Sequence, residues 1–255
     1  MSWASKRRFA YGAGTILVFV FLVGVPLAVW LYEAPTCSDG KQNQGETAID
    51  KGGPCPLLDE RTLGPGSVLW SRAFPVRGGL YSAVAYVENP NEGAGVRAVK
   101  YRFGLYDERN ILVAERRGTT FIMPGGITPV FEGTIGTGNR TVARTYFEFT
   151  SRPVWERMEN AAGVLVVGNK TMTTPELIPR LSARVRNVSV EPVLNPSFVA
   201  IVFDPAANAF VASATTLSRL APGEEKEIAF TWPDPFTSTV GRIDVLPLLP
   251  PIGLE

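Results

Sequence analysis

The feature that most constrains this chain is an uncharged run from Phe9 to Tyr32, which follows Lys6, Arg7 and Arg8 directly. A helix crosses the hydrocarbon core of a bilayer with about 20 apolar residues, so this run is long enough to span a membrane. Everything after the run is polar enough to be soluble. The pattern predicts a cytoplasmic tip at residues 1–8 and a transmembrane helix at residues 9–32 that contacts the lipid bilayer.

The charges that flank the run predict its orientation. Basic residues precede it, whereas the first charges after it are Glu33 and Asp39. Short flanks rich in Lys and Arg stay on the cytoplasmic side, so we expect a single-pass protein of the cell membrane with its C-terminal domains outside the cytoplasm. The alternative is a cleaved signal peptide. The run exceeds the usual apolar region of about 7–15 residues and no clear A-x-A site follows, which favours a retained anchor.

Composition excludes several classes of function. The sequence contains no histidine, which removes Ser-His-Asp and Cys-His catalysis and the usual zinc ligand sets. The net charge is +1, and residues 33–64 hold six acidic against three basic residues, so the exported part has no strong positive field. We therefore expect no nucleic-acid partner, no cofactor and no enzymatic activity, although chemistry by carboxylates alone stays open.

Residues 33–64 read as an acidic extracytoplasmic spacer. They are rich in Gly, Asp, Asn and Pro, which predicts turns and little regular structure. The segment resembles a motif of bacterial and archaeal surface proteins, C-x-D-G-x-x-N-x-x-E-x-x-x-D-C-G-G-x-C-x-x-C. The matching residues are Cys37, Asp39, Gly40, Asn43, Glu46, Asp50, Gly52, Gly53 and Cys55.

The same resemblance implies a disulfide. Lys51 and Leu58 stand where the pattern carries its other two cysteines, which leaves Cys37 and Cys55 to pair with each other. An even number of cysteines outside the cytoplasm points the same way. On the chain-entropy model, such a bond stabilises the segment by about 3 kcal/mol.

Four oxygen-bearing side chains of the spacer are candidates for a calcium site. They are Asp39, Asn43, Glu46 and Asp50. Calcium takes 6–8 oxygen ligands, often from loops, but this spacing is not that of an EF-hand. The alternative is that these residues form turns, as Asp-Gly and Asn commonly do.

Beyond the spacer, the chain repeats itself at a spacing of 98 residues, which predicts two related domains at residues 65–160 and 161–255. A repeat of this length is a duplicated domain and not a solenoid unit of 20–50 residues. The recurring pairs include Ala85 with Ala183, Val87 with Val185, Asn89 with Asn187, and Pro124-Gly125 with Pro222-Gly223.

Each copy reads as β structure. Ala83, Ala85 and Val87 alternate with their neighbours, as in a half-buried strand. About seven short strands in just under 100 residues is typical of an immunoglobulin-like or fibronectin-like sandwich. The expected fold class is thus mainly β, with one N-terminal transmembrane helix followed by two tandem sandwiches of this kind.

One strand carries a more specific resemblance. Phe103-Gly104-Leu105-Tyr106-Asp107, with the preceding Val87–Asn91 and the following Asn110–Val113, resembles the FxLYD domain. That family is a small β-sandwich of exported and membrane-tethered prokaryotic proteins and has no defined enzymatic activity. The resemblance implies architecture and no active site. We expect Phe103 and Leu105 to point into the core and Asp107 to cap the following turn.

Three functions remain open on the sequence. The first is a non-enzymatic structural or interaction role with an envelope protein partner, in an oligomeric state that the sequence leaves open. The second is a glycan or small-ligand binding module, for which Trp155 and Trp232 are the candidate aromatic residues; the alternative for each ring is half-buried packing. The third is an enzyme that uses carboxylates alone, with Glu224 and Glu225 as an example of an acidic pair that is more simply explained as solvated.

The C-terminal segment, Leu246–Glu255, holds four leucines and three prolines. Prolines disfavour a central strand or a helix, so we expect an extended course. Such a tail either lies back along its own domain or docks on a partner.

Overall fold

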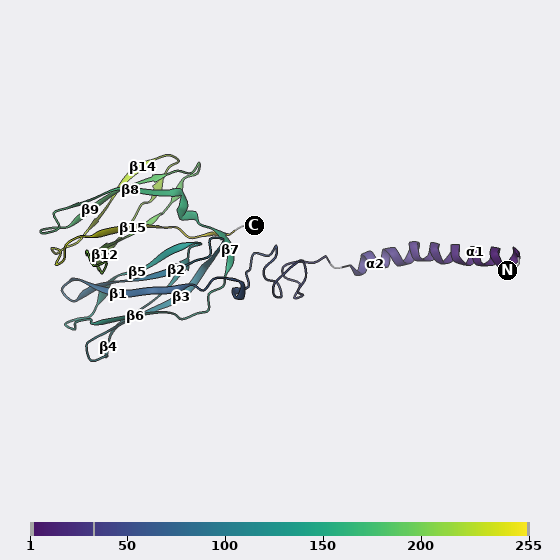
Figure 1. The fold of residues 1–255 in the computed structure, drawn as a ribbon, viewed down its shortest axis with the longest axis horizontal. Coiled ribbons are helices and arrows are strands. Elements are labelled where there is room, and N and C mark those ends of the chain that lie inside the picture. The colour runs from purple at the N-terminus through teal and green to yellow at the C-terminus, as the bar shows by residue number, and fades with distance from the viewer. Residues whose placement is uncertain (1–2, 33, 254–255) are drawn as a thin grey trace.

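The computed structural model describes residues 3–32 and 34–253. Its N-terminal helix projects away from a β-rich body (Figure 1) and consists of α1 (Trp3–Phe19), a π-helical turn η1 (Val20–Gly24) and α2 (Val25–Leu31). The helix is long and apolar enough to cross a membrane. It begins six residues before Phe9, so the basic cluster lies in its first turns.

The π-helical turn has a local cause. Pro26 lacks a backbone N–H, and its ring clashes with the carbonyl four residues earlier in a regular helix. Directly before it, the N–H of Val25 bonds to the carbonyl of Val20, five residues back. The helix therefore continues past the proline with one widened turn.

The first sandwich follows the spacer, which ends in a short 3-10 helix, η2 (Glu60–Thr62). One antiparallel sheet has the order β1-β2-β5, and the other has β3 at its centre between β4 and β6, with β3 also pairing β7. The strands are β1 (Ser67–Arg77), β2 (Leu80–Asn89), β3 (Ala94–Tyr106), β4 (Leu112–Ile122), β5 (Gly126–Gly136), β6 (Arg144–Phe149) and β7 (Glu156–Glu159).

The second sandwich begins after a 3-10 turn, η3 (Ala161–Val164). Its sheets have the orders β14-β9-β8 and β12-β11-β15, and β10 pairs β13 at one end. The strands are β8 (Leu165–Thr173), β9 (Arg180–Asn187), β10 (Val193–Leu194), β11 (Ser197–Phe203), β12 (Ala209–Thr216), β13 (Arg219–Leu220), β14 (Glu225–Thr231) and β15 (Arg242–Leu248).

The predicted fold class is confirmed: one N-terminal apolar helix precedes two β-sandwiches built from antiparallel sheets. The four sheets stack as layers (Figure 1), with the β1-β2-β5 sheet facing the β12-β11-β15 sheet of the other sandwich. Each sandwich has its own core, and a third core lies between the two sandwiches.

The third core covers the second face of each of the two middle sheets. The residues that form it are Phe74, Val84, Tyr86, Val199, Ile201, Phe203, Ala209 and Ala212. The ring of Tyr86 stacks on Trp70 at 4.4 Å between centroids, and its hydroxyl donates to Asp244 Oδ2 at 3.1 Å. Burial, followed by the charge of Asp244, raises the pKa of Tyr86.

This layer corrects one prediction. The alternation in β2 predicted a strand with one buried face, but Ala83, Ala85 and Val87 face the core of the first sandwich while Val84 and Tyr86 face the third core. Both faces of β2 are therefore covered. A strand buried on both faces appears in sequence as a continuous apolar run, and β11 shows the same pattern.

Two buried asparagines hold the ends of the sandwiches in the same way. The side-chain amide of Asn89 donates to the carbonyls of Ala94 and Met123 at 2.7 and 2.8 Å. That of Asn187 donates to the carbonyls of Glu191 and Leu220 at 2.7 and 3.2 Å. Both side chains are fully buried. Each satisfies backbone carbonyls that a buried loop would otherwise leave unpaired.

The strand that resembles the FxLYD pattern is arranged as expected. Phe103 and Leu105 are fully buried in the core of the first sandwich. Asp107 Oδ1 accepts the backbone N–H groups of Arg109 and Ile111 at 3.0 and 2.9 Å, which caps the turn after β3.

The C-terminal segment lies back on its own chain. β15 continues through Pro247 to Leu248, which is possible because β15 lies at the edge of its sheet and pairs, among the described strands, with β11 alone. Leu249 is buried in the core of the second sandwich. Residues 252–253 form β16 (Ile252–Gly253), which pairs with β7 of the first sandwich, so the tail crosses from one sandwich to the other.

Candidate functional site

The spacer folds around a disulfide and a buried carboxylate. Cys37 and Cys55 are bonded, with their Cα atoms 5.4 Å apart. Inside this loop, the buried Glu46 accepts the N–H groups of Asn43 and Asp50 through Oε2, each at 3.2 Å. Its Oε1 lies 3.1 Å from Cys55 Sγ. The pairing is the one that the surface-protein resemblance implies, and the glutamate of that motif organises the loop.

The glycine pair of the motif also has a structural reason. Gly52 and Gly53 both have positive φ, at +76° and +55°. A Cβ on Gly52 would lie 2.4 Å from Thr47 Oγ1, and one on Gly53 would lie 2.9 Å from the carbonyl oxygen of Gly45. Only glycine combines this backbone conformation with such close contacts.

The four candidate calcium ligands come together, but most of their oxygens already accept hydrogen bonds. Asp39 Oδ2 accepts the amide of Asn43 at 2.8 Å, and the Asp50 carboxylate accepts the N–H of Gly40 at 3.2 Å. The bond from Asn43, followed by that from the Lys41 backbone, lowers the pKa of Asp39. Among the described residues, Asn43 Oδ1 is buried without a hydrogen-bond partner. The calcium site stays a prediction, and the hydrogen bonds account for the loop without a cation.

The spacer is attached firmly to the first sandwich. The N–H of Leu58 donates to the carbonyl of Trp155 at 2.9 Å, and the N–H of Arg157 donates to the carbonyl of Pro56 at 2.7 Å. Arg152 forms an ion pair with Glu60. Nearby, the Arg61 side chain bonds to Asp59 and holds the pKa of that carboxyl at about 2. The disulfide loop and the first sandwich therefore form one connected surface.

Breaking the disulfide should loosen the spacer and leave the sandwiches intact. Replacing Cys37 and Cys55 together by serine removes about 3 kcal/mol of loop-closure stabilisation from residues 37–55. Hydrogen exchange of the full chain in detergent micelles should show faster exchange in residues 43–55. β3 and β11 should keep their protection, because both lie in cores that the disulfide does not touch. Equal loss of protection in β3 would contradict this prediction.

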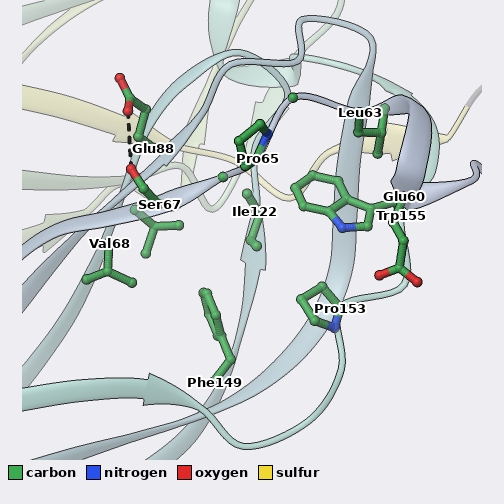
Figure 2. Close-up of a pocket in the computed structure, with 13 residues that line it drawn as sticks. Glu60, Leu63, Pro65, Ser67, Val68, Glu88, Ile122, Phe149, Pro153 and Trp155 are labelled. Carbon is green, nitrogen blue, oxygen red and sulfur yellow. Dashed lines mark hydrogen bonds between the residues drawn. The ribbon is translucent and has the colours of Figure 1, made fainter.

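A groove of about 380 Å³ lies where the spacer meets the first sandwich (Figure 2). Trp155 stands half-buried within it, with Phe149 and Ile122 along the same groove. Glu60 and Glu88 supply the carboxylates, and Glu88 Oε2 accepts the hydroxyl of Ser67 at 3.3 Å. Apolar side chains predominate in the lining, so the groove is suited to holding an apolar group.

The two candidate tryptophans differ in their placement. Trp155 lines this groove and also packs against the core of the first sandwich. Trp232 is buried in the core of the second sandwich, where its indole N–H donates to the carbonyl of Ala212 at 3.2 Å. Trp232 therefore belongs to packing, which was the alternative to a ligand role, and its ring is not on the surface.

The acidic pair at the second sandwich is not simply solvated. Glu224 accepts the N–H of Ala221 at 2.6 Å and pairs with Lys226 at 3.1 Å, and these bonds lower its pKa. Glu225 pairs with Arg184 at 3.4 Å. The two carboxylates cap a turn and join neighbouring strands.

Sequence reasoning missed an aromatic pair on the open face of the first sandwich. Tyr106 of β3 and Tyr146 of β6 have ring centroids 5.3 Å apart. Tyr146 is one of the few exposed aromatic side chains of the sandwiches. The available signal was the alternation of Phe147 and Phe149, which pack on the core, with Tyr146 and Glu148, which the period of two places on the outer face.

Comparisons with known proteins add little. No family model matches the chain, and no curated protein matches it. A red sea bream transglutaminase is 10% identical with a TM-score of 0.24, over 73% of this chain and 30% of that chain. A Bacteroides uniformis beta-glucuronidase is 15% identical with a TM-score of 0.19, over 69% of this chain and 22% of that one.

A tandem CBM22 domain from Paenibacillus barcinonensis Xyn10C is 9% identical with a TM-score of 0.16, over 73% of this chain and 90% of that one. The chain thus spans less than a third of the transglutaminase and of the glucuronidase. Similarities at these TM-scores carry no argument about the function of this chain.

Proposed function

We propose that this chain is a single-pass membrane protein whose exported part is a rigid, non-enzymatic interaction arm of the cell envelope. The observation that carries the proposal is the third core, which joins the two sandwiches through residues such as Tyr86, Val199 and Ile201. A flexible tandem array would expose these side chains. A joined pair presents its surfaces in a fixed relation, which is what a bridging role requires.

The short connection to the anchor supports this role. Five residues separate Leu31, at the end of α2, from Cys37 of the disulfide loop. A fully extended chain of this length spans at most about 22 Å. Because the disulfide loop is attached to the first sandwich near Trp155, the arm would stay close to the membrane surface.

Two further observations support the wider proposal. The absence of histidine and the engagement of acidic pairs such as Glu224 with Lys226 favour binding over catalysis. The matching bonds of Asn89 and Asn187 favour an origin of the two sandwiches by duplication. We also keep the relationship to the FxLYD family as a proposal that rests on Phe103–Asp107.

The proposed orientation predicts a protease result. Protease added to intact spheroplasts should digest the sandwiches and leave a fragment that contains the helix, because Lys6, Arg7 and Arg8 should hold the N-terminus in the cytoplasm. Replacing these three residues by glutamate should weaken this preference and protect part of the population. Full protection of the unmodified protein would contradict the orientation.

Site-specific photo-crosslinking in native membranes tests the interaction role. Leu177 and Val190 are both exposed and lie at opposite ends of β9, so they sample the two ends of the second sandwich. A photoreactive phenylalanine analogue at one of these positions should give a discrete adduct with an envelope protein, while the other position serves as its control. Adducts to lipid alone, or no protein adduct at either position, would overturn the bridging role.

A further inference from the structure

The open face of the β4-β3-β6 sheet carries an aromatic corner. The planes of Tyr106 and Tyr146 meet at 88° with 5.3 Å between ring centroids. Tyr146 is 55% exposed, whereas Tyr106 is half-buried. Because the inner face of this sheet covers the first core, the two rings lie on the side that faces solvent.

Gly104 shapes the corner. This residue is the direct cross-strand partner of Tyr146, and because it has no side chain, the Tyr106 ring can lie close against the sheet. A Cβ at this position would lie 2.8 Å from Tyr106 Cε2. Beside this ring lies a hollow of about 350 Å³, which is lined by Arg102, Gly104, Tyr106, Asn110, Tyr146, Phe147 and Glu148.

Fixed polar groups border the aromatic corner. Arg102 donates through Nε to Glu148 Oε1 at 2.8 Å and through Nη1 to Glu115 Oε2 at 3.1 Å. On the other side, Arg144 Nη1 donates to Asn110 Oδ1 at 3.3 Å. The charges of the guanidinium and carboxylate groups balance, so the hollow has no strong preference for a charged ligand.

Packing within the sheet explains the position of Tyr106 but not that of Tyr146. The Tyr106 ring lies across Gly104, and an aromatic ring over a strand glycine stabilises a sheet. Tyr146 is not needed for that contact. An exposed tyrosine next to a pair of ionised, hydrogen-bonded side chains combines a flat apolar surface with donors and acceptors in fixed positions. Such a combination is typical of small-ligand sites, where apolar walls carry a few placed polar groups.

We propose that this hollow binds an uncharged sugar ring of a glycan. The C–H face of a pyranose is flat and apolar and matches the exposed face of Tyr146, while its hydroxyl edge matches the planar groups of Arg102, Glu148 and Asn110. Charge balance selects a neutral sugar over an acidic one. The proposal gives a site to the glycan-binding alternative that the sequence left open, and it does not depend on the bridging role.

Calorimetric titration of the full-length protein in detergent micelles tests the site. The probes are cellohexaose, chitohexaose, xylohexaose and mannohexaose. We expect at least one to bind, with Tyr146→Ala weakening its affinity at least tenfold and Tyr146→Phe weakening it less than threefold, because phenylalanine keeps the ring. Val166→Ala is the matched control, since Val166 is also exposed on a sheet of the other sandwich.

Gly104→Ala supplies an independent variant: its Cβ would lie 2.8 Å from Tyr106 Cε2, so the ring must shift at the corner and binding should also weaken at least tenfold. Melting temperatures check that Tyr146→Ala, Gly104→Ala and Val166→Ala remain folded. If none of the four hexasaccharides binds, or if Tyr146→Ala binds as tightly as the unmodified protein, the proposal is overturned. Neither result would affect the photo-crosslinking test of the bridging role.

Discussion

Replacing Ile201 by alanine should lower the free energy of unfolding by about 2–5 kcal/mol, as much as a substitution in the centre of a single domain. Ile201 is 0% exposed and lies in the core between the two sandwiches. The loss arises from the removed apolar contacts and from the cavity that close-packed neighbours on the other sandwich fill only in part. Urea unfolding of the full chain in detergent micelles, followed by tryptophan fluorescence, measures it.

Ile178→Ala is the matched control. It removes the same atoms from a side chain that is 67% exposed, so we expect a change within about 0.5 kcal/mol. The prediction has a second part. If the sandwiches unfold as one body, Ile201→Ala should accelerate hydrogen exchange in β3 and β9 together. Acceleration in β9 alone would show that the two sandwiches open independently and would remove the main support for a rigid arm.

The core inside each sandwich could be predicted from the sequence because the signal for it is local. Phe103 and Leu105 occupy alternate positions of one strand, and a period of two fixes which side chains share a face. The same holds for the turn after β3, where Asp107 is close in sequence to the N–H groups that it accepts. The anchor helix is equally local, since its length and apolarity are contiguous.

The third core could not be predicted in this way. The alternation seen in Ala83–Val87 does not say whether the second face of β2 meets water or another sheet. Val84 and Ile201 are far apart in the chain, and their meeting depends on the stacking of two complete sandwiches. The continuous apolar runs of β2 and β11 were the available signal, because a strand that is covered on both faces has no need of polar positions.

The candidate sites also combine features that local sequence predicts with features that depend on contacts between distant residues. The resemblance located the disulfide loop and its acidic residues. It could not show which N–H groups donate hydrogen bonds to Asp39 and Glu46, because these bonds depend on the backbone conformation at residues such as Asp50, with φ at +56°. The corner of Tyr106 and Tyr146 depends on the register of β6 against β3, which pairs residues about 40 positions apart. Composition gives the aromatic residues and only the register shows which of them share a hollow.

Removing the C-terminal segment should also lower the free energy of unfolding by a large amount. Truncation after Val245 deletes Leu249, buried in the second sandwich, and Leu246 and Leu248, which pack on the core between the sandwiches. It also removes the pairing of Leu246–Leu248 with Ser197–Val199 in β11. Full burial of one leucine side chain stabilises by about 1.5–3 kcal/mol, and two of these are only partly buried, so we expect a loss of about 4–6 kcal/mol.

A shorter truncation separates the contribution of packing from that of strand pairing. Ending the chain after Pro251 removes β16 and its two pairs with β7 but keeps all three leucines. Ile252 is 64% exposed, so this variant should lose less than about 1 kcal/mol. Thermal unfolding of both variants in detergent micelles gives the comparison. A tail that served to dock on a partner would leave the melting temperature unchanged in both variants. A large drop in melting temperature only in the variant that ends after Val245 means that the leucines complete the two cores. The same residues are then not available to a partner.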